Sequence, residues 1–254
     1  MSTSIYLIPG VRQLQTKLNQ LTSYIPPPPP STLDDAGTPR KILMIHAHPD
    51  PIHSYSAAIA NQVEQSAKVA GHEVRRISLY SARNDETQGY QPKFTKEEHR
   101  LQHALGEDLD QRQLAKEVKD HLRLLLWCDT LIFVYPTWWM NTPAAVKGFL
   151  DRTLVHDIAW SLPRPQADGA PASTGLIPKL TNITQIIGVS TYGAPYPIVT
   201  LAGDNGRRMI SNAVRPILSP SATVAWYGLY DMDNTTHQQR TEFLVQVDKV
   251  IKDL

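Results

Sequence analysis

The sequence is poor in cysteine, in phenylalanine and in long apolar runs. The one cysteine among 254 residues, Cys128, excludes an intrachain disulfide and fits a reducing compartment. Charges and prolines interrupt every apolar run well before the roughly 20 residues that a membrane-spanning helix needs. Twenty-five basic side chains stand against 24 acidic ones, so no strong field favours nucleic acid or an anionic membrane. With no secretory pattern, we expect a soluble cytoplasmic protein without a membrane span or a nucleic-acid partner.

Residues 1–40 differ in composition from the rest of the chain and form a predicted amino-terminal extension. No acidic residue occurs before position 34, and the polyproline stretch at 26–30 predicts an extended, stiff linker. Before it, a weakly amphipathic segment has apolar side chains at helical spacing, namely Val11, Leu14, Leu18 and Leu21. The composition favours a tethered surface helix. A docking arm is one alternative, and a mitochondrial presequence, which would place the protein in the matrix, is another.

Residues 41–254 alternate between strand-like and helix-like patterns and form the predicted domain. Strands are expected at 42–47, 73–79, 130–135, 183–190 and 223–229. Helices are expected at 56–69, 96–105, 109–127, 143–154 and 236–251. Five strands alternating with helices predict an α/β fold with a parallel sheet covered on both faces. Such sheets bind ligands beyond the carboxyl ends of their strands, where the strand order reverses.

The first strand end combines a histidine with hydroxyl residues that open a helix. His48 follows the strand, and Ser54, Tyr55 and Ser56 begin the next helix without any G-x-G-x-x-G turn. A helix amino terminus binds phosphate through its free N–H groups, and the hydroxyls and imidazole can add donors. The alternative, equally weighted on these residues alone, is that Ser54 only caps the helix.

The third and fourth strand ends are rich in aromatic side chains. A loop with two tryptophans exposes a large apolar area unless something flat covers it; it consists of Pro136, Thr137, Trp138, Trp139 and Met140. After the fourth strand come Thr191, Tyr192 and Gly193, where a glycine lets backbone approach a ring. Tyr196 follows as a candidate proton donor. For each loop the alternative is plain packing of the aromatic rings.

These three loops together resemble the NAD(P)H:quinone reductase family of flavodoxin-like proteins. The resemblance covers about residues 41–252, and its most specific part is the block from Trp139 to Arg152. The matching positions are Ala47, His48, Ser54, Tyr55, Ser56, Pro136, Trp139, Pro143, Ala144, Lys147, Gly148, Asp151, Arg152, Thr191 and Gly193. Lys147 and Asp151, four apart on a helix, are expected to form a structural pair.

The resemblance implies a doubly wound sheet of strand order 2-1-3-4-5 and a bound flavin, FAD or FMN. His48 and residues 54–56 would meet the flavin phosphate, residues 136–140 its ring, and 191–193 its other edge. NADH or NADPH would reduce the flavin, and a quinone or similar electrophile would then reoxidise it at the same place, in ping-pong order. Tyr196 matches the family's hydride-transfer tyrosine, whereas Ala202 stands where mammalian members carry a companion histidine.

The resemblance also implies a homodimer. Trp160 lies in a segment similar to the family's loop that crosses the dimer interface, where it would cap the partner's flavin and contact substrate. The alternative is that its indole anchors its own loop.

Two other functions compete with the reductase. His46, His48 and Asp50, with His53 nearby, offer imidazoles and a carboxylate to zinc, as in a zinc-dependent hydrolase or deacetylase. A non-catalytic, flavin-bearing regulatory subunit would use the amino-terminal extension for docking. No metal is expected if the reductase interpretation holds.

Overall fold

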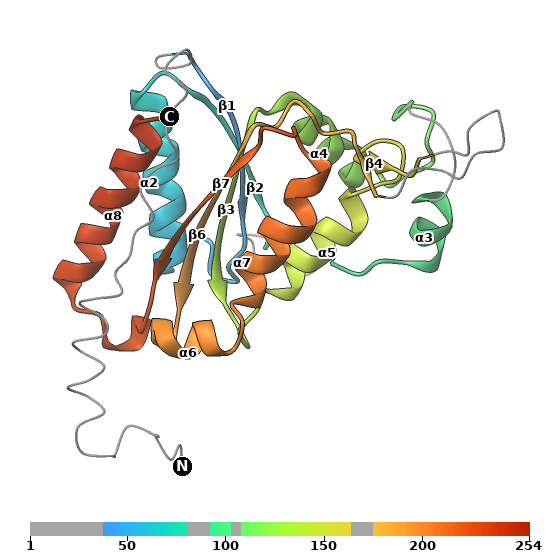
Figure 1. Ribbon diagram of the computed structural model, residues 1–254. Coiled ribbons are helices and arrows are strands. Elements are labelled where there is room, and N and C mark those ends of the chain that lie inside the picture. The colour runs from blue at the N-terminus through green and yellow to red at the C-terminus, as the bar shows by residue number, and fades with distance from the viewer. Residues whose placement is uncertain (1–37, 81–91, 103–107, 164–174) are drawn as a thin grey trace.

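A five-stranded parallel sheet forms the centre of the molecule (Figure 1). The computed structural model describes residues 38–80, 92–102, 108–163 and 175–254, so the predicted amino-terminal helix and polyproline linker lie outside the described residues. The strands, in spatial order, are β2 (Glu73–Ser78), β1 (Lys41–His46), β3 (Thr130–Thr137), β6 (Gln185–Tyr192) and β7 (Thr223–Leu229). This is the predicted order 2-1-3-4-5, and the flavodoxin-like fold is confirmed.

Helices cover both faces of the sheet, as the all-buried pattern of β1 and β3 requires. On one face lie α2 (Tyr55–Val69) and α8 (His237–Lys252), which pack on Ile42 and Met44 of β1. On the other lie α4 (Lys116–Trp127), α5 (Ala144–Thr153) and α7 (Asn205–Met209), the first two packing on Leu43 and Ile45. The alternating side chains of one strand thus divide the core into two clusters.

Several shorter elements lie outside the main sheet and the helices named above. They are α3 (Lys96–Gln102), α6 (Tyr196–Leu201), the two-stranded antiparallel sheet of β4 (Trp160–Ser161) and β5 (Ile177–Pro178), the π-helical turn Ile210–Val214, and the 3₁₀ turns Arg215–Ile217 and Met232–Asn234. The sequence pattern did not predict β4 and β5. In the described part of the chain, no helix has both the length and the apolar composition to cross a membrane.

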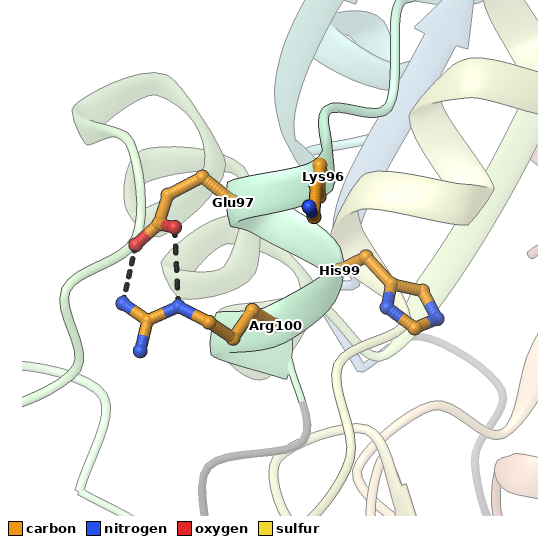
Figure 2. A pocket seen from close by; sticks show the side chains of 4 residues that line it. All are labelled: Lys96, Glu97, His99 and Arg100. Atoms are coloured by element: carbon orange, nitrogen blue, oxygen red, sulfur yellow. Dashed lines mark hydrogen bonds and ion pairs between the residues drawn. The ribbon is translucent and has the colours of Figure 1, made fainter.

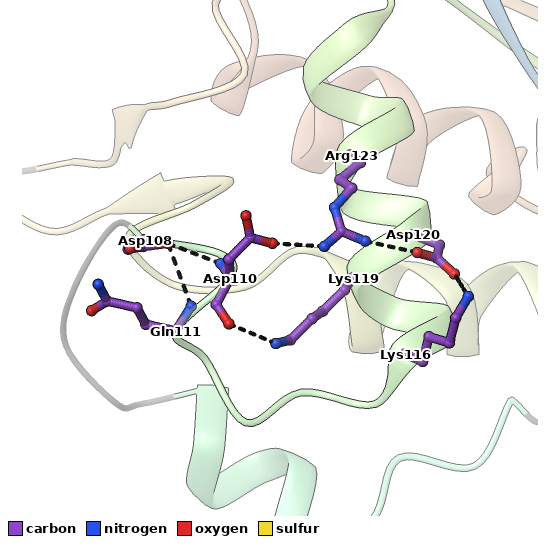
Figure 3. Close-up of polar contacts among 7 residues, drawn as sticks. All are labelled: Asp108, Asp110, Gln111, Lys116, Lys119, Asp120 and Arg123. Carbon is purple, nitrogen blue, oxygen red and sulfur yellow. Dashed lines mark hydrogen bonds and ion pairs between the residues drawn. The ribbon is translucent and has the colours of Figure 1, made fainter.

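The expected helix at 109–127 is too long at its amino end, because α4 begins at Lys116. The Asp108 carboxylate accepts the N–H groups of Asp110 (2.9 Å) and Gln111 (3.4 Å), which closes a turn in place of a helix (Figure 3). Lys119 and Arg123 of α4 then bind the Asp110 carbonyl and carboxylate. The amino-terminal part of the expected helix is therefore a turn, to which side chains of α4 bind.

Other boundaries differ by smaller amounts. The expected helix at 96–105 is described as far as Gln102, and the fourth strand runs over 185–192 in place of 183–190. The predicted C-terminal cap of α2 is confirmed, since Gly71 has a φ of +84°. The Lys147–Asp151 pair on α5 is also present.

Candidate functional site

The carboxyl ends of β1, β3, β6 and β7 meet at one edge of the sheet, beside α6 (Figure 1). β1 and β3 are neighbours, so the loops after them lie next to each other. The ring centroids of His48 and Trp138 are 6.2 Å apart. The structure therefore brings the predicted phosphate-end histidine and the tryptophan loop into one site.

The amino terminus of α2 faces this edge and is capped by Ser54. The Ser54 hydroxyl accepts the Ala57 N–H at 3.1 Å, which leaves its own proton available to a ligand. His48 Nδ1 lies 3.0 Å from both the N–H and the carbonyl oxygen of Asp50, and in the tautomer whose Nδ1 accepts the N–H, Nε2 carries the proton and can donate outward. Both side chains remain suited to an anion.

Tyr55 and Ser56 are placed differently from Ser54. The Tyr55 hydroxyl donates to the Arg240 carbonyl at 2.6 Å, and burial raises its pKa to about 12. Ser56 is buried among the residues of α2 that face the sheet. Any contact of these two residues with a phosphate would therefore come from the backbone at the helix amino terminus.

The two tryptophans form the first half of a tight turn after β3. Trp138 and Asn141 exchange two backbone hydrogen bonds of 3.0 Å, and the residues between them, Trp139 and Met140, have φ values of +49° and +56°. This is the conformation of a type I′ turn, which favours Asn-Gly. A left-handed backbone costs about 1–2 kcal/mol at each non-glycine residue. Trp139 gains no packing in return, since its side chain is fully exposed.

The strand ends beneath this turn are joined by hydroxyl groups. Ser190 donates to the Tyr135 carbonyl at 2.9 Å, so the Thr137 hydroxyl must donate to Ser190 Oγ, 2.9 Å away. Pro136 is tolerated here because its missing N–H would face β1, which has already ended. Pro136 and Thr137 thus belong to the strand and fix the start of the tryptophan turn.

The predicted loop after β6 splits into buried and exposed residues. Thr191 and Tyr192 end the strand and are buried. The Tyr192 hydroxyl lies between Trp226 Nε1 (2.8 Å) and Asp204 Oδ1 (3.1 Å), so this ring points into the protein. Gly193 is exposed, with room for a Cβ, since the nearest atom would be Asp233 Oδ2 at 3.9 Å. Of the three, Gly193 is free to approach a ligand.

Tyr196 opens α6 at the same edge and is half-buried. Its ring meets the Tyr230 ring edge-on at 5.1 Å. Ala202 ends α6 and offers no side-chain donor or acceptor. The candidate proton donor therefore packs against a tyrosine ring, and position 202 adds no polar side chain beside it.

Trp160 lies in β4, away from the tryptophan turn in the sequence. Its Nε1 donates to the Leu154 carbonyl at 2.8 Å, and its ring contacts His156 edge-on at 4.9 Å. The indole thus anchors its own loop, which was the alternative considered for it. Its predicted contact with a partner's flavin remains a prediction.

The first ligand proposed for a zinc site, His46, lies in the core of the protein. His46 is fully buried, and its Nδ1 accepts Arg76 NH2 at 2.8 Å. His48, Asp50 and His53 all lie within the described ranges, yet these ranges contain no group of three or more His, Cys, Asp or Glu side chains placed to hold a metal ion. The arrangement gives the zinc hydrolase no support.

His46 should make the protein less stable as the pH falls. Burial, with smaller effects of Arg76 and His48, lowers the pKa of His46 from 6.5 to about 3. The unfolded chain therefore binds this proton first, and the stabilisation present above pH 6.5 is lost as the pH falls toward 3. The loss is on the order of 5 kcal/mol. Urea unfolding at several pH values should show a flatter profile for His46→Leu.

The matched control for His46→Leu is His53→Gln, because His53 is an exposed histidine in the loop that follows β1. This variant should keep the wild-type profile. Burial also lowers the pKa of His72 and His121, so a residual slope of the same sign is expected. An unchanged slope in His46→Leu would show that His46 is charged at little cost in the folded protein.

A hollow of about 680 Å³ lies beside α3, away from the strand ends (Figures 1 and 2). Lys96, Glu97, His99 and Arg100 line it. Glu97 and Arg100 bind each other there at 2.6 Å, and His99 points away from that pair. With both ionic groups of the pair already matched and exposed, the hollow does not compete with the carboxyl edge as a site.

Several residues at the edge were not predicted from the sequence. Asp204, Tyr230 and Trp226 complete the surroundings of Tyr192 and Tyr196. Tyr230 directly follows β7, so a search of the fifth strand end would have found it. Gly206 of α7 lies so close to the tryptophan turn that a Cβ would be 3.2 Å from Thr142 N.

Comparison with known proteins places the chain among flavodoxin-like sequences. A family model described as "Flavodoxin-like fold" matches residues 40–205. An "Uncharacterized NAD(P)H oxidoreductase" of Haemophilus influenzae is 32% identical over 127 residues, which cover 50% of this chain and 56% of the relative. The human "Ribosyldihydronicotinamide dehydrogenase [quinone]" is 28% identical over 129 residues, covering 49% and 55%. The chain thus spans about half the length of these relatives.

A solved structure shows the same fold. The FMN-dependent NADH-azoreductase of Bacillus anthracis, solved in complex with FMN, superposes with a TM-score of 0.58 at 15% identity. The match covers 84% of this chain and 97% of the azoreductase. At 15% identity this similarity supports the assignment of the fold alone.

Proposed function

The chain belongs to the flavodoxin-like fold family, and from this membership and its carboxyl-edge loops we propose that it is a flavin-dependent NAD(P)H oxidoreductase. The acceptor is a quinone or a similar small, flat electrophile. The observation that carries the proposal is the strained turn at Trp139 and Met140, beside His48. Strain in a turn with no packing gain points to a site where the backbone conformation serves a ligand.

The residues of the edge fit a flavin, FMN or FAD. Ser54, His48 and the amino terminus of α2 supply donors for a phosphate. Trp138 and Trp139 supply exposed flat surfaces for a ring, and Gly193 leaves room on the other side of the edge. When bound, a flavin takes hydride from NADH or NADPH and delivers two electrons to the acceptor. The chain's part is to hold, orient and protonate, in two alternating half-reactions.

Tyr196 is the proposed proton donor. Its half-buried position lets the phenol reach a substrate and still exchange protons with water. An electrophile that gains a hydride carries an oxyanion, and the Tyr196 O–H bond breaks to give that oxyanion its proton. Water then restores the phenol.

The proposal includes a homodimer, in which the loop of Trp160 would approach the partner's site. Exposed apolar side chains on the neighbouring segments support an interface, namely Leu162 (55% exposed), Leu176 (47%) and Ile177 (41%). A cytoplasmic location is part of the same proposal, supported by the lone buried thiol of Cys128.

An anaerobic titration tests this function. Purified full-length protein is incubated with FMN or FAD, freed of excess flavin and followed by absorbance as NADH or NADPH is added. We expect one flavin per chain, bleaching with a nucleotide and return of the band with a quinone. Failure to retain either flavin would overturn the proposal. Retention without turnover would leave the non-catalytic flavin-bearing subunit.

A further inference from the structure

Three tyrosines and one aspartate form a continuous contact line behind the carboxyl edge. Tyr192 ends β6, Tyr196 opens α6 and Tyr230 follows β7, while Asp204 lies between α6 and α7. Tyr196, the candidate proton donor, is thus one end of a line that three residues from other places in the chain continue.

The hydrogen bonds of Tyr192 have a fixed direction. Trp226 Nε1 can only donate, so the Tyr192 oxygen accepts that bond at 2.8 Å. The single proton of the Tyr192 hydroxyl is then left for Asp204 Oδ1, at 3.1 Å. The Tyr192 ring is 1% exposed, and Asp204 is one of the two groups that hold its hydroxyl in place.

Aromatic contacts carry this orientation to the surface. The rings of Tyr192 and Tyr230 stack at 4.4 Å with an interplanar angle of 18°, and Tyr230 meets Tyr196 edge-on at 84°. A Cβ at Gly228 would lie 2.6 Å from the Tyr230 ring, so any other residue at position 228 would displace this ring. The Asp231 N–H also donates to the Ala194 carbonyl, joining the two loops.

The backbone at Asp204 supports the same conclusion. Asp204 has a φ of +43°, a left-handed conformation at a non-glycine residue. Its carboxylate lies among Tyr192, Tyr135, Tyr230 and Arg207, and burial raises its pKa despite the bond from Tyr192. A half-buried carboxylate held in a strained backbone has a position that the surroundings determine closely.

We propose that Asp204 is a positioning residue for Tyr196: its hydrogen bond orients Tyr192, which through the stacked Tyr230 ring sets where the Tyr196 phenol lies. The inference rests on the proposed function, because it assigns Tyr196 its proton-donor role. It also gives Tyr196 a partner in place of the histidine that Ala202 cannot provide.

The first test needs no flavin and no turnover. The full chain is labelled with ¹³C at the tyrosine Cζ, and Tyr196→Phe assigns the Tyr196 signal. We expect Asp204→Ala and Tyr192→Phe to shift or broaden this signal. Asp204→Asn should leave it close to wild type, because the amide oxygen can still accept from Tyr192. The exposed Asp253→Ala is the matched control. An unmoved signal in both Asp204→Ala and Tyr192→Phe would overturn the proposal.

The second test is a double-mutant cycle in the flavin-loaded enzyme. Asp204→Ala should lower kcat about tenfold and leave KM for the nucleotide nearly unchanged. The loss is smaller than the full contribution of a general acid, because the Tyr196 phenol is misplaced and not removed. In the Tyr196→Phe background the same change should have almost no further effect. Independent, multiplying losses would refute an action through Tyr196. A moved tyrosine signal in a protein without reductase activity would overturn the proposed function and leave the coupling standing.

Discussion

Replacing Arg152 with leucine should lower the free energy of unfolding by about 3–5 kcal/mol, the typical cost of breaking a buried ion pair. Arg152 of α5 is 5% exposed at its side chain and binds Glu98 of α3 through Nε (2.8 Å) and NH2 (2.6 Å). Its NH1 lies 2.6 Å from Glu117 of α4. Although burial raises the pKa of Glu98, Arg152 and Thr95 lower it overall, so the leucine variant leaves a buried carboxylate without its cation.

Urea unfolding measures this loss, with the slope compared to exclude a changed unfolded state. The matched control is Arg100→Leu, which breaks the exposed pair with Glu97 on the same helix and should cost less than about 1 kcal/mol. Arg152→Leu and Glu98→Leu combined should cost less than the sum of the two, because no buried charge is left unpaired; Glu117, which also loses Arg152, is exposed to water. A loss as small as the control's would mean that water reaches Glu98 freely in the folded protein.

Replacing Tyr196 with phenylalanine should slow reduction of the acceptor by about 10²–10⁴-fold, the contribution typical of a positioned general acid. The variant keeps the ring and its edge-on contact with Tyr230 and removes only the hydroxyl group, with the proton it would donate. Hydride transfer from NAD(P)H should change much less, because the oxyanion forms in the second half-reaction. Stopped-flow absorbance of each half-reaction, without oxygen, separates the two.

Tyr227→Phe is the matched control for this experiment. Its hydroxyl is buried on the α8 side of the sheet and has no hydrogen-bond partner among the described residues, so its removal should leave both half-reactions unchanged. Equal rates in Tyr196→Phe and wild type would remove the proton-donor role. A loss confined to the nucleotide half-reaction would place the phenol beside the hydride donor.

The parallel sheet was predictable because apolar runs and helical spacing report burial directly, whereas its strand order was predicted from the family resemblance. Ile42 and Met44 face one helical layer and Leu43 and Ile45 the other, so β1 appears in the sequence as an unbroken apolar run. The start of α4 was not predictable in this way. Residues 109–115 are mostly good helix formers, but Asp108 closes a turn there through local hydrogen bonds that compete with the helix.

The candidate site was predictable in its location and less so in its side chains. Polar and aromatic residues after the strands indicated the edge, and His48 and Trp138 do meet there. The sequence could not show that Tyr192 and Ser56 point inward. Both lie within an element, β6 or α2, and the exact start or end of that element determines which face their side chains take. Asp204 was missed since its role depends on a contact with Tyr192 across twelve residues of chain.

The tryptophan turn also gives the protein a built-in optical reporter. The Trp139 indole is fully in water, whereas the Trp226 indole is buried and hydrogen-bonded to Tyr192. Indole emission moves to shorter wavelength when water leaves the ring, so within the combined emission of the five tryptophans Trp139 contributes at the red end and Trp226 at the blue end. Any molecule that settles on the carboxyl edge changes the red part of the spectrum first. Occupancy of this edge can thus be followed by light from the unlabelled chain, even for a ligand that has no colour.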